Sequence, residues 1–153
     1  MTDIRVGIVG CGGRGRGHMR VLHTFDDVEL TAVCDPFAAS RDQAGEEFGV
    51  AGRYETVEAM LDAEDLDAAV VATPAHLNAP SALPCLARGI DTLLEKPPGL
   101  SLDETHALKE AAAQSGARGM VGWNRRFDPH VNRVRSEVGA RGPVYQLVGE
   151  FHK

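Results

Sequence analysis

The order of apolar and polar residues along the chain is typical of alternating strands and helices. Short apolar runs rich in β-branched residues predict strands at residues 4–9, 28–34, 52–54, 68–72, 92–95, 118–123 and 144–151. Helical spacing of apolar residues predicts helices at residues 13–25, 38–48, 56–63, 77–88 and 129–138, and another after the capping pair Ser101 and Glu104. This alternation predicts an α/β fold, a doubly wound parallel sheet (Rossmann fold) with three αβα layers.

Glycine and proline punctuate this pattern. Gly49 follows the helix at 38–48 and is expected to end it, because glycine readily adopts the left-handed conformation of a helix C-terminus. Pro84 lies inside the helix at 77–88, where proline removes a backbone hydrogen bond. We therefore expect a kink in that helix.

A glycine-rich turn follows the first strand. Gly10, Gly12 and Gly15 form G-x-G-x-x-G between a strand and a helix, which is the context that dinucleotide binding requires. The first glycine permits the turn, the second lets the backbone approach a pyrophosphate, and the third lets the helix pack closely. The helix N-terminus attracts phosphate, so we expect NAD here rather than a merely flexible turn. The predicted cofactor-binding residues of the turn are Gly10, Cys11, Gly12, Gly13, Arg14 and Gly15.

Asp35 ends the second predicted strand. A carboxylate there accepts hydrogen bonds from the adenosine ribose hydroxyls and repels a 2′-phosphate, which favours NAD over NADP. Arg41 lies close behind and suits a 2′-phosphate, so NADP is the alternative cofactor. The structural alternative for Asp35 is that it begins the turn into Pro36.

Further candidates follow later strands, because an open parallel sheet binds ligands at the carboxyl ends of its strands. Those ends carry Thr73-Pro74-Ala75-His76, Glu95-Lys96-Pro97 and Asn124-Arg125-Arg126. Lys96 is the candidate catalytic residue, since a partly desolvated ammonium group hydrogen-bonds a reacting oxygen strongly. A solvated Glu–Lys pair is the alternative. His76 alone is equally consistent with a helix cap or a partly buried polar residue.

Composition and charge narrow the range of functions. The 153 residues are 43% hydrophobic with a formal net charge of −6, so we expect a globular protein without a nucleic-acid partner, which would need a basic surface. We expect no membrane association, because no apolar stretch approaches the ~20 residues of a span. No secretory leader is expected either. Cys11, Cys34 and Cys85 lack metal or disulfide spacing, and free thiols suit the cytoplasm.

Motifs spread over nearly the whole chain combine into one family pattern. They are Val6 to Gly12, Cys34-Asp35, Val70 to Pro74, Glu95-Lys96-Pro97 and Gly122 to Phe127, with Glu-Lys-Pro the most specific. Together they resemble the Gfo/Idh/MocA family, named for glucose–fructose oxidoreductase and myo-inositol dehydrogenase. The resemblance implies an NAD(P)-dependent oxidoreductase that moves hydride between the nicotinamide and an alcohol carbon of a sugar or cyclitol. A different two-domain Rossmann dehydrogenase fits less well, because it would not explain Glu-Lys-Pro.

The resemblance also implies roles for matching residues. Lys96 would hydrogen-bond the reacting hydroxyl, stabilise the developing alkoxide and pass on its proton. Glu95 would hold the ribose on the nicotinamide side. The other residues implied at the cofactor or substrate are Thr73, Pro74, His76 and Asn124 for the cofactor, and Arg125 and Arg126 for the substrate.

The chain departs from the family pattern in two informative places. Family members often carry His five residues after the Thr of Thr-Pro, where this chain has Asn78. They are also considerably longer, with a second sheet domain that supplies the substrate pocket and dimer face. We expect residues 1–142 to be the dinucleotide-binding domain and 143–153 the first strand of that substrate and dimerisation domain. The rest of it would come in cis, from a second copy or from a partner chain; a module that binds NAD without catalysis is the alternative.

Overall fold

The computed structural model describes residues 3–146 and 148. The chain divides into two compact units, Met1–Gly122 and Trp123–Lys153. We describe each unit by itself. Within the described residues, no helix has both the length and the apolar character needed to cross a membrane.

A six-stranded parallel sheet forms the centre of the first unit. Its strands are β1 (Ile4–Val9), β2 (Val28–Cys34), β3 (Gly52–Tyr54), β4 (Ala68–Val71), β5 (Asp91–Leu94) and β6 (Gly119–Val121). The spatial order is β3-β2-β1-β4-β5-β6, and every neighbouring pair is parallel. The predicted doubly wound sheet is therefore confirmed.

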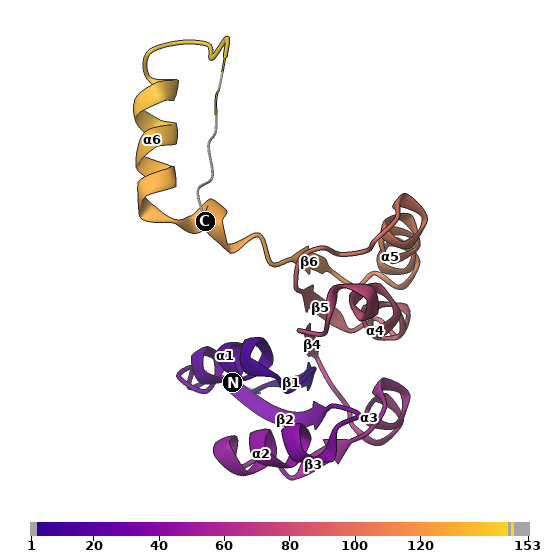
Figure 1. The fold of residues 1–153 in the computed structure, drawn as a ribbon. Coiled ribbons are helices and arrows are strands. Elements are labelled where there is room, and N and C mark those ends of the chain that lie inside the picture. The colour runs from indigo at the N-terminus through magenta and orange to yellow at the C-terminus, as the bar shows by residue number, and fades with distance from the viewer. Residues whose placement is uncertain (1–2, 147, 149–153) are drawn as a thin grey trace. The chain divides into compact units, whose positions relative to one another are not determined.

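Helices cover both faces of this sheet. They are α1 (Gly13–Leu22), α2 (Ala38–Phe48), α3 (Val57–Ala63), α4 (Ala75–Ala87) and α5 (Leu102–Ser115). Figure 1 shows α1 and α2 on one side of the strands and α3, α4 and α5 on the other. This arrangement is the predicted three-layer αβα architecture.

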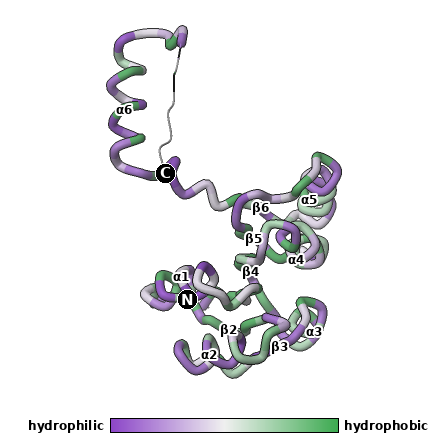
Figure 2. Tube along the Cα trace, viewed as in Figure 1, coloured by the Kyte–Doolittle hydropathy of each residue, from purple (hydrophilic) through white to green (hydrophobic). Residues whose placement is uncertain are grey.

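The core lies in two layers because successive residues of a strand point to opposite faces. Ile8 packs with Met19 of α1 on one face, and Val9 packs with Met60 and Leu86 on the other. The apolar colouring of the strands in Figure 2 reflects this burial on both sides. The continuous apolar runs in the sequence are thus the expected pattern for strands covered on both faces.

The strand order creates a crevice at the carboxyl end of the sheet. β1 and β4 are neighbours, yet β1 continues to β2 on one side and β4 continues to β5 on the other. The two connections therefore separate above the junction. Open α/β sheets bind ligands at this point.

The predicted helices differ from the observed ones mainly at their ends. α1 ends at Leu22 rather than at residue 25. α2 ends at Phe48, and Gly49 follows it in the left-handed conformation with φ +69°, as expected. α4 is one continuous helix that contains both Pro84 and Pro80. The carbonyl groups that lose a partner belong to His76 and Pro80, which are exposed, so water can replace the missing hydrogen bonds.

The second unit contains a 3₁₀ turn, η1 (Asn124–Phe127), and helix α6 (Pro129–Gly139). The Asp128 side chain caps α6 by accepting a hydrogen bond from the His130 N–H at 2.8 Å. The strand expected at 144–151 is not formed by residues 144–146 and 148, and its remaining residues lie outside the described ones. A strand needs a neighbour for its N–H and C=O groups, and none of the described residues pairs with this stretch. The domain boundary at residue 142 stays a prediction.

Two glycines of α1 offer a matched test of this packing. A Cβ at Gly15 would lie 1.8 Å from the carbonyl oxygen of Gly10, whereas one at Gly17 would meet nothing within 4 Å. We expect Gly15→Ala to lower the free energy of unfolding by about 3 kcal/mol or more, because backbone must move. Gly17→Ala is expected to change it little, or to raise it by up to about 1 kcal/mol. Urea unfolding measures both variants, and equal effects would contradict this account of the turn.

Candidate functional site

The glycines of the turn between β1 and α1 differ in whether the protein's own packing requires them. Gly10 has φ +92°, and a Cβ there would lie 2.6 Å from the carbonyl oxygen of Ala72. Gly15 is fixed by its contact with the Gly10 carbonyl. A Cβ at Gly12 would instead meet nothing within 4 Å. The protein's own packing does not require a glycine at Gly12, so its bare backbone leaves space for a ligand beside the helix N-terminus.

Asp35 stands at the carboxyl end of β2, only 8% exposed, and faces this turn. Its Oδ2 accepts a hydrogen bond from the Cys11 N–H at 2.8 Å, and its Oδ1 accepts one from the Phe37 N–H at 2.9 Å. The first bond ties Asp35 to the glycine turn, and the second forms the turn into Pro36 that was the structural alternative for Asp35. Arg41 donates to the main-chain oxygen of Asp35 at 2.9 Å.

Two buried thiols flank the same carboxylate. Burial, together with the nearby Asp35, raises the pKa of Cys11 and of Cys34 to about 12. Both thiols are therefore neutral at physiological pH. The floor of the turn adds no second negative charge where phosphate is expected.

A cleft of about 480 Å³ opens between the ends of β1, β2 and β4. This volume falls within the usual range for small-molecule sites. Its walls combine predicted polar residues with apolar ones; they include Gly10, Gly12, Asp35, Thr73, Pro74, Phe37, Val57, Leu77 and Pro80. His76 is exposed and does not line the cleft, unlike its neighbours Pro74 and Leu77.

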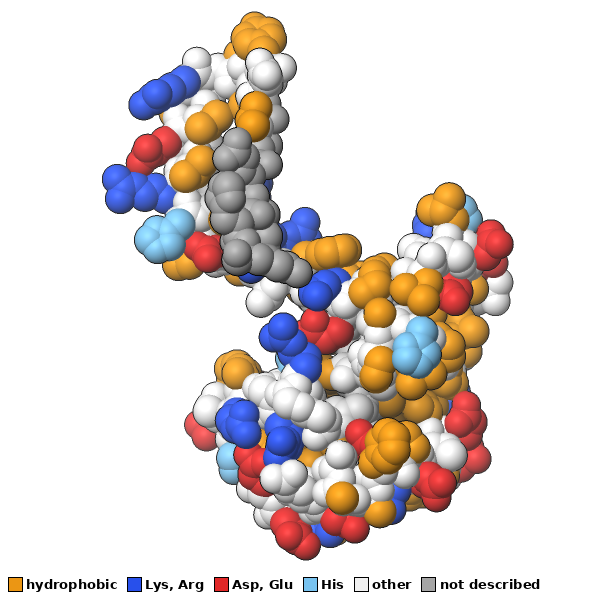
Figure 3. All heavy atoms as spheres, in the orientation of Figure 1, with side chains coloured by type: hydrophobic (Ala, Val, Ile, Leu, Met, Phe, Trp, Pro, Cys, Tyr) orange, Lys and Arg blue, Asp and Glu red, His pale blue; other side chains and the backbone are white. Residues whose placement is uncertain are grey.

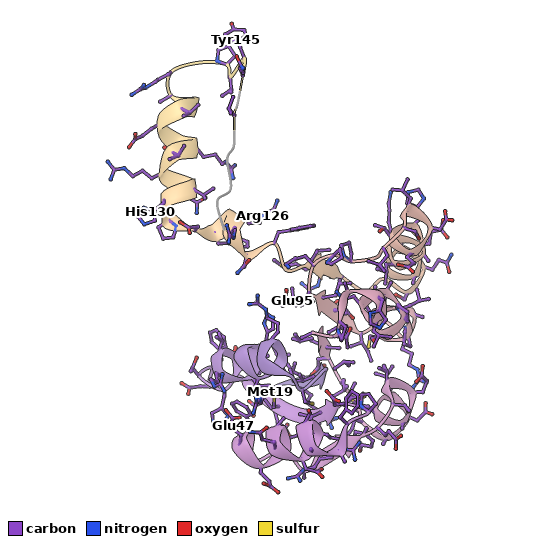
Figure 4. The ribbon with its side chains drawn as sticks, in the orientation of Figure 1. Met19, Glu47, Glu95, Arg126, His130 and Tyr145 are labelled. Carbon is purple, nitrogen blue, oxygen red and sulfur yellow. The ribbon has the colours of Figure 1, made fainter. Side chains whose placement is uncertain are left out.

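Glu95, which is labelled in Figure 4, follows β5 and faces α1. Its side chain is 13% exposed, and its Oε1 lies 2.9 Å from Nε2 of His18 and 3.5 Å from Nε of Arg14. His18 was not among the site residues predicted from the sequence. The spacing of Arg14 and His18, one helical turn apart, is the signal that places both on the face toward Glu95.

A second connection joins the ends of β4 and β5. The Thr73 hydroxyl donates to Oδ1 of Asn78 at 2.9 Å. Nδ2 of Asn78 donates to the carbonyl oxygens of Glu95 and Pro97 at 3.0 and 2.9 Å. The sequence interpretation recorded Asn78 only as a departure from the family pattern, so this contact was missed.

Lys96 projects from the segment that Asn78 holds. Its side chain is exposed, and among the described residues none forms a hydrogen bond or ion pair with its ammonium group. The described residues therefore do not supply the partial desolvation expected for Lys96. Asn124, Arg125 and Arg126 lie in η1 of the second unit.

Basic side chains of the first unit lie beside acidic ones. Arg16 and Arg20 of α1 pair with Glu47 of α2, and Arg14 pairs with Glu95. Figure 3 shows acidic as well as basic side chains spread over the visible face of the first unit. The basic side chains of α1 are thus matched by carboxylates.

The sheet order, the glycine turn and the carboxylate one strand away define a dinucleotide-binding Rossmann domain. A family model described as "Oxidoreductase family, NAD-binding Rossmann fold" (GFO_IDH_MocA) matches residues 4–123. The chain therefore belongs to this family, and the resemblance read from its motifs is confirmed.

Individual relatives agree with this assignment. The chain is 34% identical over 151 residues to the rhizopine catabolism protein MocA of Rhizobium meliloti, covering 95% of this chain and 46% of that protein. It is 33% identical to an inositol 2-dehydrogenase of the same species, covering 88% and 40%. The structure of scyllo-inositol dehydrogenase from Lactobacillus casei with NAD(H) and scyllo-inositol matches with TM-score 0.83 and 27% identity, covering 92% and 43%. The chain thus spans less than half the length of these relatives.

Proposed function

We propose that this chain is the cofactor-holding part of an oxidoreductase that moves hydride between NAD and an alcohol carbon of a sugar or cyclitol. The main observation in support of this proposal is that the glycine turn, Asp35 and the Glu95-Lys96 pair lie at the same end of the sheet. The inositol dehydrogenases among its relatives support the substrate class.

The cleft fits a dinucleotide. The open backbone at Gly12, with Gly13 and Arg14 in the first turn of α1, suits the pyrophosphate. Asp35 is placed to accept hydrogen bonds from the adenosine ribose, and apolar residues such as Phe37 and Leu77 suit the adenine ring. The carboxylates of Glu55 and Glu58 also line this end, which adds to the preference for NAD over NADP.

The residues after β5 supply the chemistry that this chain contributes. When bound, NAD accepts a hydride from the alcohol carbon. The Lys96 side chain hydrogen-bonds the substrate hydroxyl. As the neutral amine it takes up the proton of an alcohol that is being oxidised, and as the ammonium group it stabilises the alkoxide and returns that proton in the reverse reaction. Glu95, held by His18, hydrogen-bonds the ribose on the nicotinamide side. By the family resemblance, Asn124 is assigned to the cofactor, and Arg125 and Arg126 to the substrate.

Substrate selection belongs to a second sheet domain, supplied in cis or by another chain, and the oxidoreductase works in the cytoplasm. That domain also removes Lys96 from water. A second candidate function is NAD binding without turnover by this chain alone. It is favoured by the exposure of Lys96, because an alcohol at an open surface is poorly oriented for hydride transfer.

Gly12→Val tests the cofactor site without disturbing the fold, because its Cβ meets no atom within 4 Å. We expect unchanged urea unfolding and a loss of NAD affinity of about 100-fold, or 2.7 kcal/mol. Calorimetric titration with NAD measures the affinity, and Gly17→Ala in the same helix is the matched control. An unmodified chain that binds no NAD would refute the proposed function.

Glu95→Ala tests the nicotinamide end separately. We expect NAD affinity to fall about tenfold, from loss of a charged hydrogen bond, and ADP affinity to stay constant, because ADP lacks the second ribose. Glu110→Ala, an exposed glutamate of α5, is the matched control. Equal losses for NAD and ADP would show that Glu95 acts on the whole site rather than on that ribose.

Lys96→Ala tests the chemical step. The chain is mixed with NAD and myo-inositol, and NADH absorbance is followed. We expect the variant to lose about 10²- to 10⁴-fold in rate, as for removal of a general acid–base, whereas Lys109→Ala on α5 keeps the rate. NAD binding without turnover in the unmodified chain supports the second candidate. Turnover untouched by Lys96→Ala refutes the role assigned to Lys96.

A further inference from the structure

Asn78 ties together the ends of two strands. It stands in α4 just after β4, is only 1% exposed, and reaches the segment that leaves β5. Its amide group is fully used: the oxygen accepts from the Thr73 hydroxyl, and the nitrogen donates to two carbonyl oxygens. A neutral amide carries two N–H donors, so Asn78 has one for each carbonyl.

Those two carbonyls belong to Glu95 and Pro97, the residues on either side of Lys96. The backbone of Lys96 is therefore held from both sides, while its side chain stays exposed. We propose that Asn78 is a positioning residue that sets where the Lys96 ammonium group stands, acting through the main chain without touching substrate or cofactor. This inference rests on the proposed function of Lys96.

The local sequence explains why a side chain is needed. β5 ends at Leu94, and the Glu95 N–H still bonds to the carbonyl of Val71 at 2.9 Å. Pro97 and Pro98 follow, and neither has an N–H, so this segment cannot continue the sheet ladder. The donors come instead from the neighbouring helix, and Asn78 supplies them.

Thr73 fixes which way the amide points. Its hydroxyl donates to Oδ1 of Asn78, so the opposite side of the amide, with both N–H groups, faces the β5 segment. Thr73 also lines the cofactor cleft. The cleft wall and the position of Lys96 are thus joined through one partly buried network, in which removing any donor leaves an acceptor without its protein partner.

The test compares Asn78→Asp with Asn132→Asp in the whole 153-residue chain. Aspartate keeps the shape of asparagine but cannot donate to either carbonyl when ionised. Asn132 lies exposed on α6, so its variant makes the same change of charge without touching the network. Melting temperature and NAD affinity are measured for both variants.

The decisive readout is the position of Lys96 itself. The chain contains three lysines, Lys96, Lys109 and Lys153, so reductive ¹³C-methylation gives few NMR signals, and Lys96→Arg identifies the one of interest. In the unmodified chain and Asn132→Asp, we expect NAD to shift the Lys96 signal. In Asn78→Asp, NAD affinity stays within about tenfold, whereas this shift falls by at least half and the Lys109 signal is unchanged.

A folded Asn78→Asp chain that binds NAD and shows the full Lys96 shift overturns the inference. So does an unmodified chain that binds NAD with no Lys96 shift. If Asn78→Asp fails to fold, Thr73→Val and Thr73→Ser are measured instead. Loss of the Lys96 shift in Thr73→Val and its return in Thr73→Ser support the network. A full Lys96 shift in both variants refutes it. Absence of NAD binding in the unmodified chain is a separate result, which refutes the proposed function.

Discussion

The close approach of α1 to the end of β1 is the constraint on which the site depends. Gly15 lies against the carbonyl of Gly10, nearer than any side chain would permit. This contact fixes the first turn of the helix over the crevice. It brings the Cys11 N–H within reach of Asp35 and the His18 ring within reach of Glu95. One backbone contact therefore places both ends of the candidate cofactor site.

Parallel strand pairing brings the other residues of the candidate site together, because the carboxyl ends of all six strands meet at one edge of the sheet. Residues far apart in the chain become neighbours there: Thr73, Asn78 and Pro97 belong to one hydrogen-bonded group. Such a buried polar group is stabilising only when every member has a partner, and in this network each polar atom of Asn78 has one. The sheet brings these residues close together, and the side-chain amide of Asn78 fixes how the hydrogen-bonded groups are oriented.

The periodic pattern predicted the fold well, because strands covered on both faces leave continuous apolar runs. Two glycines of the turn, Gly10 and Gly15, are required by backbone contacts. Contacts between distant residues were not predictable: His18 and Glu95 are 77 positions apart, and nothing in either residue alone indicates the other. Asn78 was missed because two of its three partners are main-chain oxygens, which carry no sequence signal. The strand expected at 144–151 fails over its described residues for lack of a neighbour, a tertiary requirement that local propensity cannot report.

The two backbone hydrogen bonds to Asp35 have a consequence for the thermodynamics of ligand capture. Because the Cys11 and Phe37 N–H groups already donate to the two carboxylate oxygens, the Asp35 side chain loses its rotational freedom during folding. An arriving sugar hydroxyl meets an acceptor that needs no further immobilisation, which spares a fraction of the roughly 0.5–1.5 kcal/mol that ordering a side chain costs at an interface. Under the proposed function, affinity at that position thus originates partly in the folding of the protein itself.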